Sequence, residues 1–170
     1  MFFKALGENL FVSFDPNYRE LLFGNNQEEF IQRSWAFMEK ADFFKVSDEE
    51  AFLLTGKSSI EEAAAVFIER THAVFAITCG KDGSLLGHDK KMVQVPSIPV
   101  QVQDTTGAGD AFVGALLFQL SKYSKKEIHS FSTKEWTGLL SNANKAGART
   151  CEYMGAMEAF KQLNDTIFSD

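Results

Sequence analysis

The sequence predicts an α/β fold in which a largely parallel sheet is flanked by helices. Short apolar runs rich in Phe, Val and Ile alternate along the chain with segments whose apolar residues have helical spacing. This alternation is typical of right-handed βαβ units, in which helices cover parallel strands. The chain has 170 residues, of which 45% are hydrophobic and 24% charged, so its length and composition suit about one globular domain with a buried core.

Three strands separated by helices are predicted in the first half of the chain. The strands are expected at residues 10–14, 42–46 and 73–78, where apolar residues run almost continuously. The helices between them are expected to begin at pairs with N-capping spacing, which are Asn26 with Glu29, Ser47 with Glu50 and Ser59 with Glu62. Gly56 stands where the second of these helices is expected to end.

A hairpin followed by helices is predicted in the second half. Strands at residues 84–86 and 92–95 flank Asp89 and Lys90, and Pro96 and Pro99 then keep the chain extended. Helices are expected at residues 111–120, from Ser132 through Asn144, and after Gly155. The 17 Phe, together with Trp35 and Trp136, are interpreted as core residues.

Charge and composition argue against several classes of protein. The formal net charge of −6 disfavours nucleic-acid binding, because that binding rests on neutralisation of phosphates by Lys and Arg. The longest apolar stretch, at residues 111–118, is far shorter than the about 20 residues of a membrane-spanning helix, and residues 1–8 lack the apolar block of a signal peptide. The two cysteines and three histidines have no metal-ligand spacing. We therefore expect a cytoplasmic protein that binds neither nucleic acid nor membrane.

The most informative segment is the turn before the predicted helix at residues 111–120. It reads Asp104-Thr105-Thr106-Gly107-Ala108-Gly109-Asp110. Glycines let main-chain amides approach a ligand closely, and the start of a helix favours an anion. Asp110 is placed to accept a proton from an attacking hydroxyl, so the turn suits phosphoryl transfer. A plain glycine turn, with Asp110 stabilising the helix dipole, fits the same residues, and the spacing matches neither a Walker A loop nor a dinucleotide fingerprint.

Together with Ala111 and Phe112, this turn resembles the second signature of the ribokinase-like, or PfkB-type, carbohydrate kinases. Four further segments resemble the same family in the same order, namely Ser13-Phe14-Asp15-Pro16-Asn17-Tyr18-Arg19, residues 45–50 with Leu54-Thr55-Gly56, residues 77–83, and residues 143–148 with Gly155-Ala156. The first of these is similar to the DPNxR segment in the form seen in fructokinases. Because the five segments cover nearly the whole chain, it is identified as a member of this family.

The resemblance implies roles for residues at the turns. In this family the glycine turn binds the transferring phosphate, and the Asp that ends it is the catalytic base. Those roles fall on Gly107, Ala108, Gly109 and Asp110. By the same resemblance, the residues that face the nucleotide are Thr78, Gly80, Lys81 and Gly83 at its phosphates and Asn144 beside the adenine.

The resemblance also implies metal sites. Glu50 matches the acidic residue that orients magnesium-bound water, although the family's usual Asn three residues earlier is Ser47 here, and a capping box explains the same pair. Asp104 and Thr106 match a loop that holds a monovalent cation in many members. Arg19 is implied to contact a phosphate or a sugar, with a solvated arginine as the alternative. The implied cofactors are ATP and Mg²⁺, with K⁺ as the monovalent cation.

The resemblance covers the C-terminal half of a family member. Residues 1–170 are expected to form the nucleotide side of a three-layer ribokinase-like fold, without the front half that supplies early strands, the lid and most residues that hold sugar hydroxyls. The sheet would then be incomplete at its N-terminal side, and an exposed apolar edge invites pairing. We expect a homo-oligomer, or pairing with a front-half polypeptide.

The leading functional hypothesis is a sugar kinase that transfers the γ-phosphate of ATP to a hydroxyl of a small carbohydrate. Fructose is favoured by the resemblance at residues 15–19. One alternative is a catalytically incomplete nucleotide-binding or interaction domain, because the acceptor half is missing. Another is a kinase of the same superfamily with a different acceptor, such as ribose, 2-keto-3-deoxygluconate or a nucleoside.

Overall fold

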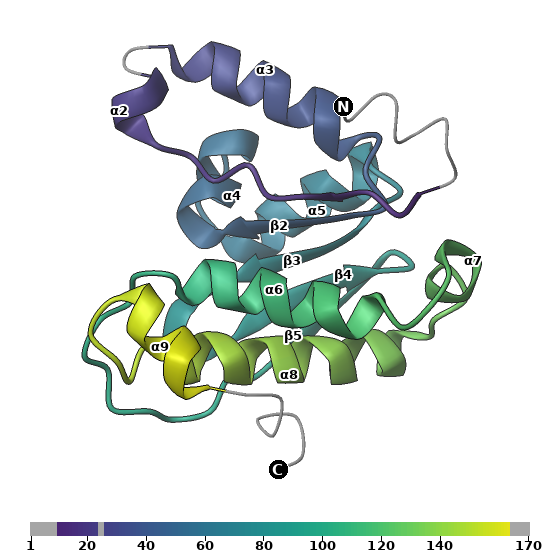
Figure 1. Ribbon diagram of the computed structural model, residues 1–170. Coiled ribbons are helices and arrows are strands. Elements are labelled where there is room, and N and C mark those ends of the chain that lie inside the picture. The colour runs from purple at the N-terminus through teal and green to yellow at the C-terminus, as the bar shows by residue number, and fades with distance from the viewer. Residues whose placement is uncertain (1–9, 24–25, 164–170) are drawn as a thin grey trace. The chain divides into compact units, whose positions relative to one another are not determined.

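A computed structural model describes residues 10–23 and 26–163 (Figure 1). The chain divides into two compact units, which we call unit 1 (Met1–Thr78 with Leu85–Val93) and unit 2 (Cys79–Ser84 with Gln94–Asp170). Unit 1 holds most of the sheet, and unit 2 holds the later helices. No helix in the described ranges is long and apolar enough to cross a membrane.

The sheet has five strands in the order β1-β2-β3-β4-β5. They are β1 (Ser13–Phe14), β2 (Phe43–Ser47), β3 (Val74–Thr78), β4 (Ser84–His88) and β5 (Lys91–Val95). β1 pairs with β2 and β2 with β3 in parallel. The connections at residues 79–83 and 89–90 are too short for a crossover, so β4 and β5 run antiparallel to their neighbours. The sheet is therefore mixed, and the α/β class is confirmed.

The helices largely follow the predicted order. They are α2 (Glu20–Phe23), α3 (Gln27–Met38), α4 (Asp48–Thr55) and α5 (Ile60–Arg70) in unit 1, and α6 (Ala108–Leu120), α7 (Lys125–Ile128), α8 (Thr133–Thr150) and α9 (Ala156–Gln162) in unit 2. α6 begins earlier than predicted, at the glycine turn itself, and α8 continues beyond Asn144. α2 and α7 were not predicted, because four residues are too few for an apolar period to show.

Side-chain caps fix most of the helix starts that the sequence predicts. Capping boxes are present at Ser47 with Glu50 and at Ser132 with Glu135, and the Ser59 hydroxyl accepts a hydrogen bond from the amide of Glu62. The capping box predicted at Asn26 is wrong. Its backbone, at φ −100° and ψ 50°, is not extended as an N-cap requires, and its side-chain amide donates to Glu29 Oε2 at 2.5 Å instead.

A cluster of aromatic rings forms the core of unit 1. Phe44 and Phe75 are paired across β2 and β3, and their rings stack with centroids 5.3 Å apart. Phe67 of α5 meets both rings edge-on at 5.2 and 5.4 Å, and Trp35 of α3 lies 5.6 Å from Phe67. A Cβ at Gly87 would lie 2.1 Å from the Phe75 ring, so only glycine fits there. The prediction that the aromatic residues fill the core is confirmed for this cluster.

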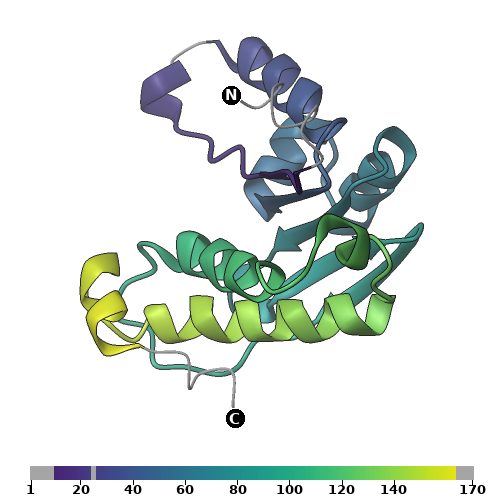
Figure 2. The same cartoon turned by 45° about the vertical axis from the view of Figure 1, so that its right-hand side comes forward.

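In unit 2, α6 lies alongside α8, and α9 contacts α8 (Figures 1 and 2). Gly147 of α8 allows the close approach, because a Cβ there would lie 3.1 Å from the carbonyl oxygen of Ala108. Ala108 is the first residue of α6. The packing of α8 therefore fixes the position of the glycine turn that begins α6. Trp136 of α8 is buried, as predicted.

We expect Phe67→Ala to lower the free energy of unfolding by about 3–5 kcal/mol, because it removes a fully buried ring that three other rings contact. Urea unfolding measures the loss. Phe160→Ala is the control, since that ring is 52% exposed on α9, and its cost should be about 1 kcal/mol or less. Equal losses in the two variants would contradict the described core.

Candidate active site

The glycine turn of unit 2 has a backbone that only glycine adopts readily. Gly107 is the N-cap residue of α6 with φ 84° and ψ −1°, in the left-handed region. A Cβ at Gly107 would also lie 2.4 Å from the Cβ of Ala156. Ala108, Gly109 and Asp110 form the first turn of α6, where main-chain amides have no acceptor within the helix. Such amides, together with the positive end of the helix dipole, favour an anion at the start of a helix.

Asp110 lies in the same first turn, and its side chain is exposed. Within the part of the chain that the structure describes, its carboxylate makes no hydrogen bond and no ion pair. It is therefore free to accept a proton from a molecule held at the helix start. The structure thus places this carboxylate in the same helical turn as main-chain amides that have no acceptor within the helix. The roles predicted for Asp110 as a base and for the turn as a phosphate site stay predictions.

Asp104 anchors the loop that leads into this turn. Its Oδ1 accepts hydrogen bonds from the Thr106 amide at 2.9 Å and the Thr106 hydroxyl at 2.7 Å, while its Oδ2 accepts one from the Gly155 amide at 2.9 Å. These bonds lower the pKa of the Asp104 carboxyl. The amide of Gln103 also donates to the Cys151 carbonyl at 2.8 Å. The loop is thereby tied to the end of α8 and the start of α9.

A second glycine turn lies at the short 3₁₀ helix η1 (Gly80–Asp82). Gly80 has φ 54° and Gly83 has φ 91°, both in the region that favours glycine. A Cβ at Gly83 would lie 2.2 Å from the Val95 carbonyl oxygen and 2.6 Å from the Ser97 amide nitrogen. Lys81 is exposed on this turn. The turn is therefore packed directly against the segment that follows β5.

Asn144 of α8 reaches the same segment. Its side chain is 6% exposed, and its amide nitrogen donates to the carbonyl oxygens of Val95 at 2.9 Å and Pro96 at 3.4 Å. The segment at residues 95–97 therefore joins two predicted nucleotide contacts, Gly83 and Asn144. Thr78, in contrast, belongs to unit 1, where its hydroxyl donates to the Val46 carbonyl at 3.3 Å.

Glu50 of unit 1 is 8% exposed, and both its carboxylate oxygens accept main-chain hydrogen bonds. Oε2 accepts from the Ser47 amide at 2.8 Å, and Oε1 accepts from the Tyr18 amide at 2.7 Å. The capping box is confirmed. Glu50 also ties the loop after β1 to the end of β2, which the sequence did not predict. Its role toward magnesium stays a prediction.

Lys45, in the middle of β2, carries a buried charge that was not predicted from the sequence. Its side chain is 9% exposed, and its Nζ lies 3.5 Å from Oδ2 of Asp15, the residue that follows β1. Burial raises the pKa of Asp15, and the Lys45 charge only partly counters this rise. A signal was available, because a lone charge inside an apolar strand is buried only when it is paired.

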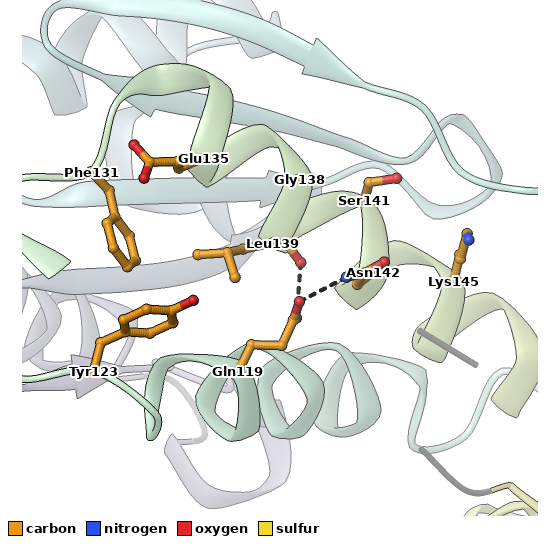
Figure 3. A pocket seen from close by; sticks show the side chains of 9 residues that line it. All are labelled: Gln119, Tyr123, Phe131, Glu135, Gly138, Leu139, Ser141, Asn142 and Lys145. Carbon is orange, nitrogen blue, oxygen red and sulfur yellow. Dashed lines mark hydrogen bonds between the residues drawn. The ribbon is translucent and has the colours of Figure 1, made fainter. Parts of the chain in front are cut away.

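A groove of about 530 Å³ lies on unit 2 between the C-terminal end of α6 and the part of α8 from Glu135 to Lys145 (Figure 3). Gln119 bridges the two helices, since its amide donates to the Leu139 carbonyl at 3.1 Å and its oxygen accepts from Asn142 at 2.8 Å. The wall residues are Gln119, Tyr123, Phe131, Glu135, Gly138, Leu139, Ser141, Asn142 and Lys145. None of the predicted site residues lines this groove, so it is separate from the glycine turns.

Comparison with known proteins finds one family and many relatives. The family described as "pfkB family carbohydrate kinase" matches residues 3–163. Aminoimidazole riboside kinase of Salmonella typhimurium is 38% identical over 164 residues, which make up 94% of this chain and 49% of that protein. Fructokinase of Vibrio alginolyticus is 32% identical over 166 residues, covering 96% of this chain and 51% of that protein.

Solved structures give the same result. A double mutant of fructokinase from Vibrio cholerae O395, in a form with fructose, ADP and potassium ion bound, matches with a TM-score of 0.84 at 31% identity, over 98% of this chain and 53% of that chain. Aminoimidazole riboside kinase from Salmonella enterica, complexed with aminoimidazole riboside and an ATP analog, matches with a TM-score of 0.76 at 36% identity, over 93% of this chain and 52% of that chain. The chain thus spans about half the length of these relatives.

We expect the contribution of Asp104 to stability to depend on pH. Its hydrogen bonds hold the pKa below the ordinary value of 3.8, so the carboxylate stabilises the fold above pH 3.8 and loses this effect as the pH falls through the lowered pKa. Urea unfolding should show Asp104→Asn to be less stable than wild type at neutral pH, with a difference that shrinks below pH 3.8. A difference that stays constant across this range would contradict the assignment.

Proposed function

The chain belongs to the PfkB family of carbohydrate kinases, and from this premise we propose that it is the nucleotide-side half of an ATP-dependent sugar kinase. The observation that carries the proposal is the start of α6, where main-chain amides suited to an anion share one helical turn with the Asp110 carboxylate, which has no partner among the described residues. We also propose that residues 1–170 correspond to the C-terminal half of the kinase domain, because they cover about half of each relative reported above.

The proposed reaction is transfer of the ATP γ-phosphate to a hydroxyl of a small carbohydrate. Asp110 removes the hydroxyl proton, and the oxygen attacks phosphorus as the bond to the β-phosphate oxygen breaks. The amides of the first turn of α6 stabilise the charge on the transferring group. Gly107 is needed because its left-handed backbone directs the chain into that turn.

The nucleotide would lie against the second glycine turn. Gly80, Lys81 and Gly83 face its phosphates, with Thr78 just before them in the chain, and Asn144 lies on the adenine side. This placement is supported by the shared contact of Gly83 and Asn144 with the segment at residues 95–97. An ATP analog and ADP are named in the structures of two relatives.

Magnesium and a monovalent cation fit the polar groups that are present. No group of three or more His, Cys, Asp or Glu side chains suited to a metal occurs in the described ranges. Magnesium would therefore take most of its ligands from nucleotide phosphates and water, with Glu50 holding a water. At the other site, Asp104 and the loop at Thr106 would hold K⁺, since Asp104 Oδ2 accepts one hydrogen bond, from the Gly155 amide, and keeps a second lone pair.

The acceptor class has two candidates. Fructose is favoured by the segment at residues 15–19 and by the fructokinases among the relatives. A riboside is favoured by the similarity to aminoimidazole riboside kinase. Both are neutral polyhydroxy molecules, so the proposed chemistry at Asp110 is the same for each.

We expect the purified chain to associate with itself or with a polypeptide that supplies the acceptor side. β1 is a two-residue strand at the end of the sheet order, and an unpaired strand edge presents free amides and carbonyls. Light scattering should give a mass above 19.0 kDa, the mass of one chain. A clean monomer with a sharp thermal transition would argue against this expectation.

The test of the base is Asp110→Ala. The assay uses an assembly of this chain, with itself or with a polypeptide that supplies the acceptor side, whose wild-type form is active. We expect sugar-dependent ADP release by this assembly to fall by about 100- to 10,000-fold in the variant, because the general base is removed. Calorimetric titration should show that the variant still binds Mg-ATP. Gly109→Val, which places a side chain at the anion site, should lose that binding.

Glu61→Gln is the control, since Glu61 is exposed at the start of α5, away from the glycine turns in the chain, and should keep full turnover. Activity of Asp110→Ala close to that of Glu61→Gln would show that the base is another group. A folded wild-type chain that binds no Mg-ATP would favour an interaction domain instead.

A further inference from the structure

The groove between α6 and α8 of unit 2 takes no part in the proposed phosphoryl transfer (Figure 3). Its volume of about 530 Å³ lies within the range of about 300–1,000 Å³ that is typical of sites for small molecules. Gln119 in its wall and Asp110 belong to the same helix and stand about 14 Å apart along it, at roughly 1.5 Å of rise per residue. A small molecule in this groove is therefore too far from Asp110 to be the phosphoryl acceptor.

Gly138, inside α8, keeps the groove open. It is exposed, its φ lies outside the left-handed region, and a Cβ there would meet no atom within 4 Å. Neither the backbone nor the packing therefore requires glycine at this position. Glycine inside a helix lowers the stability of the helix relative to other residues, so its presence needs another reason. The space that the missing side chain leaves in the groove wall is such a reason.

Two aromatic rings form one end of the groove. The rings of Tyr123 and Phe131 are perpendicular, with an interplanar angle of 89° and centroids 5.0 Å apart. The Phe131 ring also meets the buried Trp136 ring edge-on at 6.1 Å, which limits its movement. The Leu139 side chain points toward the first two rings (Figure 3). A flat aromatic ligand suits this end, because ring pairs favour edge-to-face and offset stacked arrangements.

Two side-chain amides fix the polar middle of the groove. The amide nitrogen of Gln119 donates to the carbonyl oxygens of Ala115 and Leu139, each at 3.1 Å. Its oxygen is therefore the acceptor of the 2.8 Å hydrogen bond from Asn142, which also fixes the orientation of the Asn142 amide. Asn142 Oδ1 has no hydrogen-bond partner among the described residues. This oxygen is therefore available to accept a hydrogen bond from a ligand N–H.

The two ends of the groove carry opposite charges. Lys145 lies one helical turn after Ser141 on the same face of α8, and it is the one cation among the described residues that line the groove. Glu135 lies at the aromatic end (Figure 3). Hydrogen bonds from the hydroxyl and the amide of Ser132 lower the pKa of Glu135, so this carboxylate is ionised at neutral pH. A ligand with a single negative charge is therefore drawn to the Lys145 end and repelled from the aromatic end.

We propose that this groove binds a planar heteroaromatic carboxylate. The ring of the ligand packs against Tyr123 and Phe131. A ring N–H donates to Asn142 Oδ1, and the carboxylate accepts from the Lys145 ammonium and the Ser141 hydroxyl. This inference goes beyond the proposed kinase function and does not depend on it, because it gives unit 2 a second small-molecule site, separate from the glycine turns.

The first test is direct binding of indole-2-carboxylate, in which a ring N–H stands next to the carboxylate. NMR follows the ring signals of Tyr123 and the side-chain amide signals of Asn142 in the wild-type chain. Saturable shifts of both sets of signals support the proposal, and the absence of shifts in either set overturns it. Indole-2-carboxamide has the same ring and no charge, so it should bind about 10-fold more weakly. Equal affinities of the two compounds would also overturn the proposal.

The second test fills the groove. Gly138→Leu places a side chain in the open space of the wall, and it should weaken the binding of indole-2-carboxylate by at least about 10-fold. The variant should fold, because Leu favours a helix more than Gly does, and urea unfolding checks this. Gly114→Leu on α6 is the matched control, since a Cβ there also meets no atom within 4 Å and Gly114 does not line the groove. The control should keep wild-type affinity within about twofold, and a Gly138→Leu variant that does the same would overturn the proposal.

The third test assigns the charge. Lys145→Met should lower the affinity for indole-2-carboxylate to that of the carboxamide and leave the affinity for the carboxamide unchanged. Lys134→Met is the control, because Lys134 is exposed on the same helix and does not line the groove. A Lys145→Met variant that still prefers the carboxylate about 10-fold would overturn the proposal. Titration of the wild-type chain with Mg-ATP is a separate measurement, and absence of that binding would contradict the kinase proposal alone.

Discussion

The structure of unit 2 depends on the exact placement of the first turn of α6. Three contacts hold it. Gly107 packs against Ala156, Gly147 of α8 lies against the carbonyl of Ala108, and the Asp104 carboxylate receives the Gly155 amide at 2.9 Å. A main-chain anion site works only if its amides already point at the ligand, because reorienting them in the bound state would cost the stabilisation they provide. The contacts that remove freedom from this turn are therefore the structural basis of the proposed chemistry.

In unit 1, side chains fix the positions of main-chain segments. Glu50 accepts two main-chain amides and so fixes both the start of α4 and the loop after β1. The Phe44 and Phe75 rings stack across β2 and β3, and Ser47, whose amide donates to Glu50, is the last residue of β2. A carboxylate with both oxygens engaged positions backbone well, and it keeps enough lone pairs to orient a water. The structural and the metal interpretations of Glu50 are thus compatible rather than exclusive.

The sequence predicted the strands, the main helices and the glycine turns because each has a local cause. Apolar runs mark β2 and β3, the spacing of Ser132 and Glu135 marks the start of α8, and Gly107 marks a left-handed turn. What it could not predict depends on tertiary contacts. The hydrogen bond from Asn144 to Val95 spans 49 residues, and the Asp15–Lys45 pair spans 30. Neither contact can therefore be recognised from the spacing of residues in the sequence. The failed cap at Asn26 likewise reflects a backbone angle that residue type does not fix.

Contacts made by main-chain amides and contacts made by side chains have different consequences for specificity. The turns at Gly83 and Gly107, which we propose as phosphate sites, depend on backbone shape, because a Cβ at either glycine would lie too close to neighbouring atoms. Acceptor contacts made of side chains change with single substitutions while the backbone stays the same. A family built this way can keep one phosphoryl-transfer site and vary its acceptor, which fits relatives named both as riboside kinases and as fructokinases. In a kinase domain of this kind, acceptor specificity is therefore expected to follow side-chain substitutions, while the glycine turns keep their backbone shape.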